Sequence, residues 1–450
     1  MTPYLSILKL VWPLALGMVN NALMQFTDRA FLAHESMTSL EAILPASMLV
    51  WIFLSFFQSA IAYSGVFVAQ YHGAKNAAAC VRCYRAAVLL SVVSGLVLFA
   101  LLPVGGFIFS LSAPSAELLA REKSYYDICL SGGFFLLGQM AAASYFTGLG
   151  RTRIVFWVNL LGNVLNVALD PVLIFGLCGF PRLGIAGAAY ATVASMFLQW
   201  AVLTWAAHRA VRGISAPGGL WGIAWKILRL GIPSGGYAVL NTLSFTVFVF
   251  ITGRVGDVAF AASNACFTVN YLLFAPMEGF ALGAQTLVGQ ACGRGDVGEA
   301  SRAVRRTLIL ALSFIGVVSA LVLICHRPIL ALFAPQDMAA ADEFMRMGRL
   351  LFFLMATWLL FDAVDVVLSG ALKGAGDAHF VFWWMLIAAF VIWLPLVFVV
   401  AQLRNTMPAL WATMIAYVVV ISVGSYLRWR RGKWKSYDLM SGTERRGVER

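Results

Sequence analysis

Asp28 and Asp170 lie well inside long apolar runs, and Asn166 precedes Asp170 by one helical turn on the same helix face. A carboxylate in the middle of a membrane costs at least about 2.5 kcal/mol on insertion scales, so such residues usually have partners and a function. Carboxylate and amide oxygens can bind a small hard cation, and two crowded carboxyl groups can share a proton. We therefore predict a cation or proton site here. The structural alternative is that Asp28 pairs with Arg29, or that either acid caps a helix end.

A second group of polar residues occupies apolar runs in the other half of the chain. Asp362 and Asp365 are about one turn apart in one run, whereas Asn241 and Glu278 stand in two others. Two like charges on one helix face repel each other, so we expect one of the aspartates to be neutral at rest. The alternative is that one of them, Asp365 in particular, faces a wet cavity as a solvated or substrate-facing charge.

The apolar runs themselves indicate an integral membrane protein. Of 450 residues, 61% are hydrophobic and only 12% are charged, whereas a soluble protein has about 45–50% and 25%. This composition excludes a soluble enzyme and a disordered chain. A helix needs about 20 apolar residues to cross a bilayer, and twelve runs satisfy this condition. The predicted spans are 5–33, 43–70, 86–110, 124–148, 153–177, 184–207, 226–251, 262–289, 307–332, 349–371, 379–403 and 408–428.

The distribution of positive charge predicts the orientation of these spans. If the N-terminus is cytoplasmic, most of the 32 Lys and Arg residues fall in cytoplasmic segments, including a basic tail at 429–450. An even number of spans then places both termini in the cytoplasm. The formal net charge of +12 is thus explained by membrane orientation, and we expect no nucleic-acid partner. The basic tail is expected to contact anionic membrane lipid.

The two halves of the chain repeat each other. A shift of 220 residues aligns Pro13 with Pro233, Asn21 with Asn241 and Arg85 with Arg305. Each copy has six spans, so both copies enter the membrane in the same direction, and such parallel repeats place a cavity between two lobes. We predict an all-α membrane protein of twelve helices in two six-helix lobes, residues 1–207 and 226–428, joined by a cytoplasmic linker at 208–225. No P-loop pattern is present, so the energy for transport would come from an ion gradient or from the substrate's own gradient.

Several segments, in order along the chain, resemble motifs of the multidrug and toxic compound extrusion (MATE) family. Residues 26–33 look like the first-helix Val-Asp-Thr-x-x-x-Gly pattern of that family, although Arg29 and Ala33 depart from it. The other matching segments are 147–152 (Thr-Gly-Leu-Gly-Arg-Thr), 166–170 (Asn-x-x-x-Asp), 183–192 (Leu-Gly-Ile-Ala-Gly-Ala-Ala-Tyr-Ala-Thr), 287–290 (Leu-Val-Gly-Gln), and 362–364 (Asp-Ala-Val) leading to 369–374 (Ser-Gly-Ala-Leu-Lys-Gly).

The resemblance implies site residues in both lobes. In the first lobe it implies a cation or proton site, with Pro13 allowing the first helix to bend; the matching residues are Asp28, Asn166, Asp170 and Thr192. In the second lobe Asp362 matches the family's aspartate. Three positions depart from the pattern: Asn241 replaces a common Glu, Asp365 replaces a common Gln, and Glu278 is unusual.

The resemblance also implies a function. We expect a non-enzymatic antiporter of the bacterial inner membrane that exports amphipathic, often cationic, small molecules in exchange for Na⁺ or H⁺ by alternating access. We expect a monomer with no cofactor and no metal beyond Na⁺. The main alternative is a flippase for a lipid-linked sugar or another lipid, which would need a basic cavity. A lipid-modifying membrane enzyme is a more distant alternative, because its His/Asp or metal constellation is missing.

Overall fold

Long apolar helices account for almost the whole chain in the computed structural model, which describes residues 3–111, 115–335, 337–439 and 443–444. Within these ranges, twelve helices are long and apolar enough to cross a membrane. The predicted all-α class and the predicted number of spans are therefore confirmed. The elements outside the helices are two-residue strands in the tail, β1 (Tyr437–Asp438) and β2 (Thr443–Glu444), which pair antiparallel.

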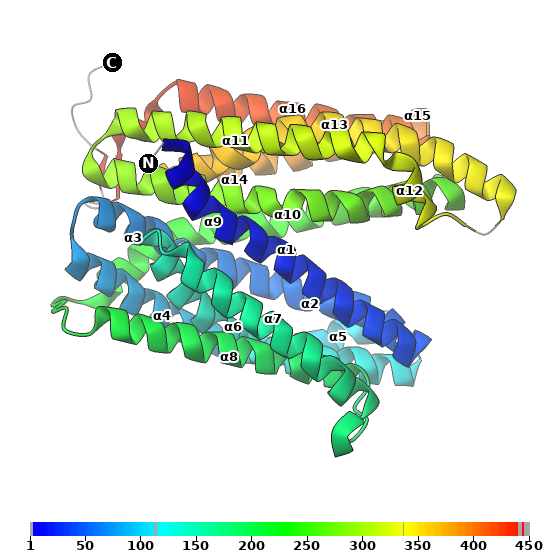
Figure 1. The fold of residues 1–450 in the computed structure, drawn as a ribbon, viewed down its shortest axis with the longest axis horizontal. Coiled ribbons are helices and arrows are strands. Elements are labelled where there is room, and N and C mark those ends of the chain that lie inside the picture. The colour runs from blue at the N-terminus through cyan, green and yellow to red at the C-terminus, as the bar shows by residue number, and fades with distance from the viewer. Residues whose placement is uncertain (1–2, 112–114, 336, 440–442, 445–450) are drawn as a thin grey trace. The chain divides into compact units, whose positions relative to one another are not determined.

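Figure 1 shows the helices in chain order. The first half contains α1 (Pro3–Glu35), α2 (Met37–Ala62), α3 (Ser64–Gly73), α4 (Ala77–Ala100), α5 (Leu102–Leu111), α6 (Ala116–Gly148), α7 (Thr152–Phe175), η1 (Leu177–Gly179) and α8 (Ile185–Val211). The second half contains α9 (Leu220–Thr252), α10 (Asp257–Arg294), α11 (Val297–Ile324), α12 (His326–Ala331), α13 (Met338–Ala375), α14 (Ala378–Leu386), η2 (Ile387–Trp393), α15 (Leu394–Leu403), α16 (Met407–Arg430) and η3 (Lys433–Ser436).

Several helices begin well before the apolar runs from which they were predicted. The third, ninth and tenth spans begin near residues 77, 297 and 340, whereas hydropathy predicts 86, 307 and 349. Side-chain caps explain the difference: Asn76 accepts a hydrogen bond from the Ala79 amide, and Asp296 and Asp337 cap α11 and α13 in the same way. Capped polar turns extend each helix beyond the hydrocarbon region, where hydropathy gives no signal.

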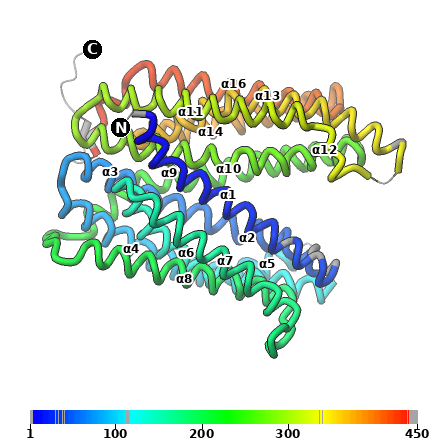
Figure 2. The backbone as a smooth tube through the Cα atoms, in the orientation of Figure 1, coloured from blue at the N-terminus to red at the C-terminus, as the bar shows by residue number. Residues whose placement is uncertain are grey.

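The chain divides into two compact units, and each boundary falls inside a helix. The first unit is Leu16–Ala238, and the second combines Met1–Ala15 with Val239–Arg450. The divided helices are α1 and α9, and both contain a proline shortly before the boundary, Pro13 and Pro233. Proline removes a backbone hydrogen bond and weakens the helix at that level. Figure 2 follows the path of the chain through these helices.

Each unit contains a helix contact made by glycine, and the two contacts correspond under the sequence repeat. In the first unit Gly231 of α9 lies against Ala60 of α2, and an added Cβ would come within 2.4 Å of the Ala60 carbonyl oxygen. In the second unit Gly279 of α10 lies against Ala15 of α1, where an added Cβ would come within 2.4 Å of the Ala15 amide nitrogen. Because α1 corresponds to α9 and α2 to α10, a duplication predicts such a matched pair.

The cores of the two units differ in character. In the first unit α6 packs against α2, α3, α4 and α8, and Gly148 of α6 lies close against Gly65 of α3. In the second unit α13 packs against α10, α11 and α16, beside a cluster of buried aromatic rings. Trp393, in the π-helical turn η2, stacks on Tyr417 with ring centroids 4.6 Å apart.

The basic tail folds back onto the second unit. Arg428 makes a bidentate ion pair with Asp377, with nitrogen–oxygen distances of 2.7 and 3.2 Å, and also donates to the Tyr437 hydroxyl. Trp434 is buried and stacks on Trp429 with centroids 4.1 Å apart. These contacts fix the start of the tail at the end of α16.

Candidate ion and substrate sites

The structure brings the four predicted residues of the first unit together. Asp28 comes from α1, Asn166 and Asp170 from α7, and Thr192 from α8, and all four side chains are buried. The carboxyl groups of Asp28 and Asp170 lie close enough to interact electrostatically, and they repel each other when both are charged. Neither Asp170 oxygen accepts a hydrogen bond from a donor among the described residues. A proton or a small cation between the two carboxyl groups would therefore satisfy atoms that the protein leaves without a donor.

Asn166 links the two sides of this cluster. With its amide oriented to satisfy both donor and acceptor, the nitrogen donates to Asp28 Oδ1 at 2.9 Å and the oxygen accepts from the Thr192 backbone amide at 3.3 Å. The opposite orientation turns the amide oxygen toward a carboxylate that can only accept, so we assign the first. The Thr192 hydroxyl donates to the Ala188 carbonyl at 3.0 Å, which leaves its lone pairs for other donors or a cation.

The cluster continues into a stripe of amides that the sequence reasoning missed. Asn163 lies on the same face of α7 as Asn166 and donates to Asn21 of α1 at 2.9 Å. Gln199 of α8 donates to the Asn163 oxygen and to Ser195, both at 3.3 Å. The polar spacing along α7 could have indicated this stripe, because residues three and four apart share a helix face.

Three predicted acids of the second unit also lie together. Asp362 and Asp365 stand on α13 and interact electrostatically with each other, and Asp362 also interacts with Glu278 of α10. Asp365 is buried and accepts a hydrogen bond of 2.6 Å from Ser425 of α16. Asp362 is half-buried and Glu278 is exposed, so the group extends from the packed helices to an accessible surface.

The side chain of Asn241 on α9 is exposed, and no hydrogen bond or ion pair between described residues connects it to the three acids. Pro13 lies within α1, as expected from the sequence. The side chain of Arg29, the alternative partner of Asp28, falls outside the described residues.

A charged network closes the end of α1 beyond Asp28. Glu35 pairs with Arg182 at 3.2 Å and with Arg121 at 3.7 Å, and Arg121 donates to Ser39 at 2.6 Å. Burial alone would raise the pKa of Glu35. Hydrogen bonds from Ser39 and Ser36 and the charges of Arg121 and Arg182 outweigh burial and lower this pKa. The network ties α1 to α2, α6 and the segment before α8.

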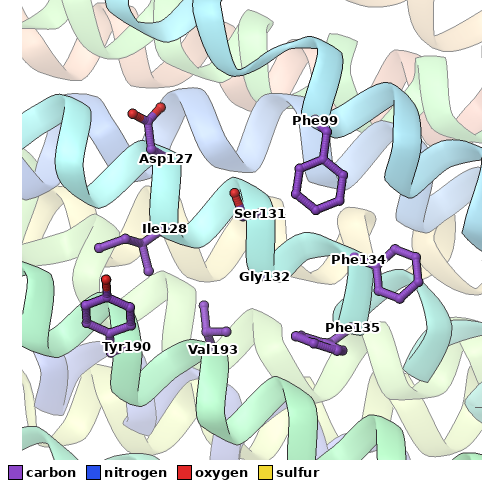
Figure 3. Close-up of a pocket in the computed structure, with 9 residues that line it drawn as sticks. All are labelled: Phe99, Asp127, Ile128, Ser131, Gly132, Phe134, Phe135, Tyr190 and Val193. Carbon is purple, nitrogen blue, oxygen red and sulfur yellow. The ribbon is translucent and has the colours of Figure 1, made fainter.

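An open groove of about 680 Å³ lies on another face of α6, between α4 and α8. Figure 3 shows Asp127 at one end of the groove and Phe134 and Phe135 at the other. The lining includes none of the predicted site residues. Because most of its surface is apolar and it lies along membrane-spanning helices, it is a surface suited to lipid rather than part of the ion site.

Comparisons with known proteins agree with this arrangement. The MatE family profile matches residues 13–172 and 233–399, which is most of the chain and both halves of the repeat. A probable multidrug resistance protein NorM from Thermotoga maritima is 27% identical over 97% of this chain and 94% of its own length.

Two solved structures have the same fold. An outward-facing multidrug resistance MATE family transporter of the MOP superfamily matches with a TM-score of 0.85 and 18% identity, covering 97% of both chains. A MOP superfamily transporter from Pyrococcus furiosus, described as having a binding pocket of reverse polarity that suggests a different function, matches with a TM-score of 0.83 and 20% identity over 97% of both chains. The chain therefore belongs to the MatE family of multidrug efflux transporters.

Proposed function

We propose that this transporter is an antiporter in which an incoming Na⁺ or H⁺ binds between Asp28 and Asp170 and an amphipathic cation leaves through the second unit by alternating access. The observation that carries the proposal is that two buried carboxyl groups lie close enough to interact electrostatically inside membrane-spanning helices. Binding of Na⁺ or H⁺ changes the charge of this site. Such binding can shift the equilibrium between the two conformations of the transporter only if the ion has a different affinity for each conformation. Each positive charge that moves inward gains about 2.3 kcal/mol per 100 mV.

Cationic substrates are supported by the second unit. Three carboxyl groups lie together there, and Glu278 is accessible. A flippase for a pyrophosphate-linked sugar would instead need basic groups around its ligand. The reverse polarity reported for the Pyrococcus furiosus relative shows why the sign of the pocket discriminates between functions on one fold.

Dye efflux from proteoliposomes tests the proposal. The purified protein is reconstituted with a fluorescent monovalent cation inside, under a Na⁺ gradient alone and then under a pH gradient alone. We expect one gradient to drive efflux, and Asp28→Asn to abolish that drive while expression and folding are retained. Gradient-driven efflux by Asp28→Asn at the wild-type rate would refute the coupling site. Inhibition by a lipid-linked oligosaccharide but not by a second cation would favour the flippase.

The membrane location of the protein is inferred from its helices and its relatives. Twelve spanning helices and bacterial relatives indicate a multi-pass protein of the inner membrane. We further propose that both termini are cytoplasmic and that the protein acts as a monomer without a cofactor. Labelling of a single introduced cysteine near the C-terminus from one side of the membrane would test the orientation.

A further inference from the structure

Lys373 lies at the end of a polar stripe on α13 that the proposed function does not use. Asp362, Asp365, Ser369 and Lys373 are spaced by three, four and four residues, so they share one face of the helix. The distribution of positive charge along the sequence predicts that Lys373 lies at the cytoplasmic end of its membrane-spanning helix. The structure places it inside α13, which continues to Ala375, and leaves its side chain half-buried.

Close packing of α10 on α13 brings Glu278 to this stripe. An added Cβ at Gly370 would lie 2.4 Å from the Ala281 carbonyl oxygen, and one at Gly374 would lie 2.3 Å from the Gln285 carbonyl oxygen. Both pairs have the same residue offset, so the two helices run in the same direction at this contact. Glu278 therefore stands about one turn before Gly370, at a level between Asp365 and Lys373.

The direction of the lysine side chain completes the arrangement. Side chains on a helix tilt toward its N-terminus, so Lys373 reaches back along α13 toward the level of Glu278. Its ammonium group interacts electrostatically with Glu278 and with Asp365. Asp365 also accepts the hydrogen bond from Ser425 at 2.6 Å. Asp362 interacts with both of these acids, so one built-in cation lies at two carboxyl groups of a group of three.

We propose that Lys373 is an internal counter-cation that occupies Glu278 and Asp365 when the substrate site is empty and is displaced by the transported cation. This inference rests on the proposed export of cations. A tethered ammonium group cannot diffuse away, so it competes with every cationic substrate at the same carboxylates. Its return would help to release the substrate, and it would keep the empty site from holding three uncompensated charges.

Removing the lysine charge is expected to strengthen substrate binding. At an effective dielectric constant near 20, a unit charge roughly 8 Å away changes the binding constant of a cation by about 30-fold, and access of water to Glu278 reduces this toward tenfold. We therefore expect Lys373→Met to bind a monovalent cation about tenfold more tightly and to release it more slowly. Lys373→Arg keeps the charge and should bind like the wild type.

The test measures equilibrium binding of tetraphenylphosphonium to the purified full-length protein, without any ion gradient. The variants are Lys373→Met, Lys373→Arg, Glu278→Gln and the double variant Glu278→Gln/Lys373→Met, with Lys433→Met in the exposed tail as the matched control. Lys373→Gln replaces Lys373→Met if the latter does not fold. We expect Glu278→Gln to weaken binding, and the gain from Lys373→Met to shrink several-fold in the Glu278→Gln background.

The outcomes separate this inference from the proposed function. Tighter binding by Lys373→Met that depends on Glu278 supports the counter-cation. Equal or weaker binding by Lys373→Met, or a gain of the same size without the Glu278 charge, overturns it while cation export stands. If the wild-type protein binds and exports no cation at all, the proposed function fails, and the inference fails with it.

Discussion

Replacing Asp170 with asparagine removes one of the two carboxyl groups that face each other in the first unit. In the wild type, the carboxyl groups of Asp28 and Asp170 lie close enough to repel each other when both are charged. Two ionised carboxylates about 4 Å apart repel each other by about 4 kcal/mol at an effective dielectric constant of 20. The wild-type site therefore needs a proton or a cation, whereas Asp170→Asn retains one carboxylate, which Asn166 can still contact.

The difference should appear in ligand-dependent stability. A ligand present at a hundred times its dissociation constant stabilises the folded state by about 2.7 kcal/mol. For a cooperative unit of this size, that corresponds to roughly 5 to 10 °C in melting temperature. We expect the wild type to gain this stability from Na⁺ if the transporter is sodium-coupled, or from a lower pH if it is proton-coupled. Asp170→Asn should gain almost none.

Thermal unfolding in detergent measures the effect, with choline chloride replacing sodium chloride at constant ionic strength and a parallel series across pH. Asp342→Asn, which changes an exposed acid at the start of α13, is the matched control and should respond like the wild type. If Asp170→Asn keeps the full wild-type response to both Na⁺ and pH, the two carboxyl groups are not the coupling site.

Three further predictions concern positions away from that site. The partners of Glu35 lower its pKa, so its ion pairs stabilise the fold above the ordinary carboxyl pKa, and this stability is lost as pH falls through the lowered value. Glu35→Gln should therefore lower the melting temperature near pH 7, and this deficit should shrink as pH falls through the lowered value. Arg428→Ala leaves the buried Asp377 without its partner and should destabilise the protein by about 3 kcal/mol in denaturant unfolding. Gly370→Ala places a methyl group against the Ala281 carbonyl oxygen and should cost about 1–3 kcal/mol in the same assay.

A specific experimental result would contradict each of these predictions. A Glu35→Gln deficit in melting temperature that keeps the same size throughout acid titration would show that the ion pairs are not its source. Full stability of Arg428→Ala would mean that Asp377 finds solvent or another donor, and the double variant with Asp377→Asn should recover part of the loss. Gly222→Ala is the control for Gly370→Ala, because no atom lies within 4 Å of a Cβ added there.

The pairing of residues far apart in the chain depends on tertiary structure. Asp28 and Asp170 are separated by more than a hundred residues, and hydropathy placed each in a helix without indicating that the helices touch. Small residues decide such contacts, because an added Cβ at Gly370 or Gly279 would collide with the neighbouring backbone. The spacing of Asn163 and Asn166 along α7 could have indicated a polar helix face, but the hydrogen bond from Gln199 of α8 to Asn163 depends on how the two helices pack.

The amino-acid sequence alone determined that this is a twelve-helix membrane protein with an internal repeat and acids inside its spans. These properties depend on local hydropathy, local charge and the internal repeat, all of which can be read from the linear amino-acid sequence. Only the tertiary structure decided that Asp28, Asn166, Asp170 and Thr192 are all buried, that α10 packs closely against the polar stripe of α13, and that α1 and α9 are each divided between the two units. Those facts depend on which helix faces pack together, and packing is set by side-chain shape in three dimensions.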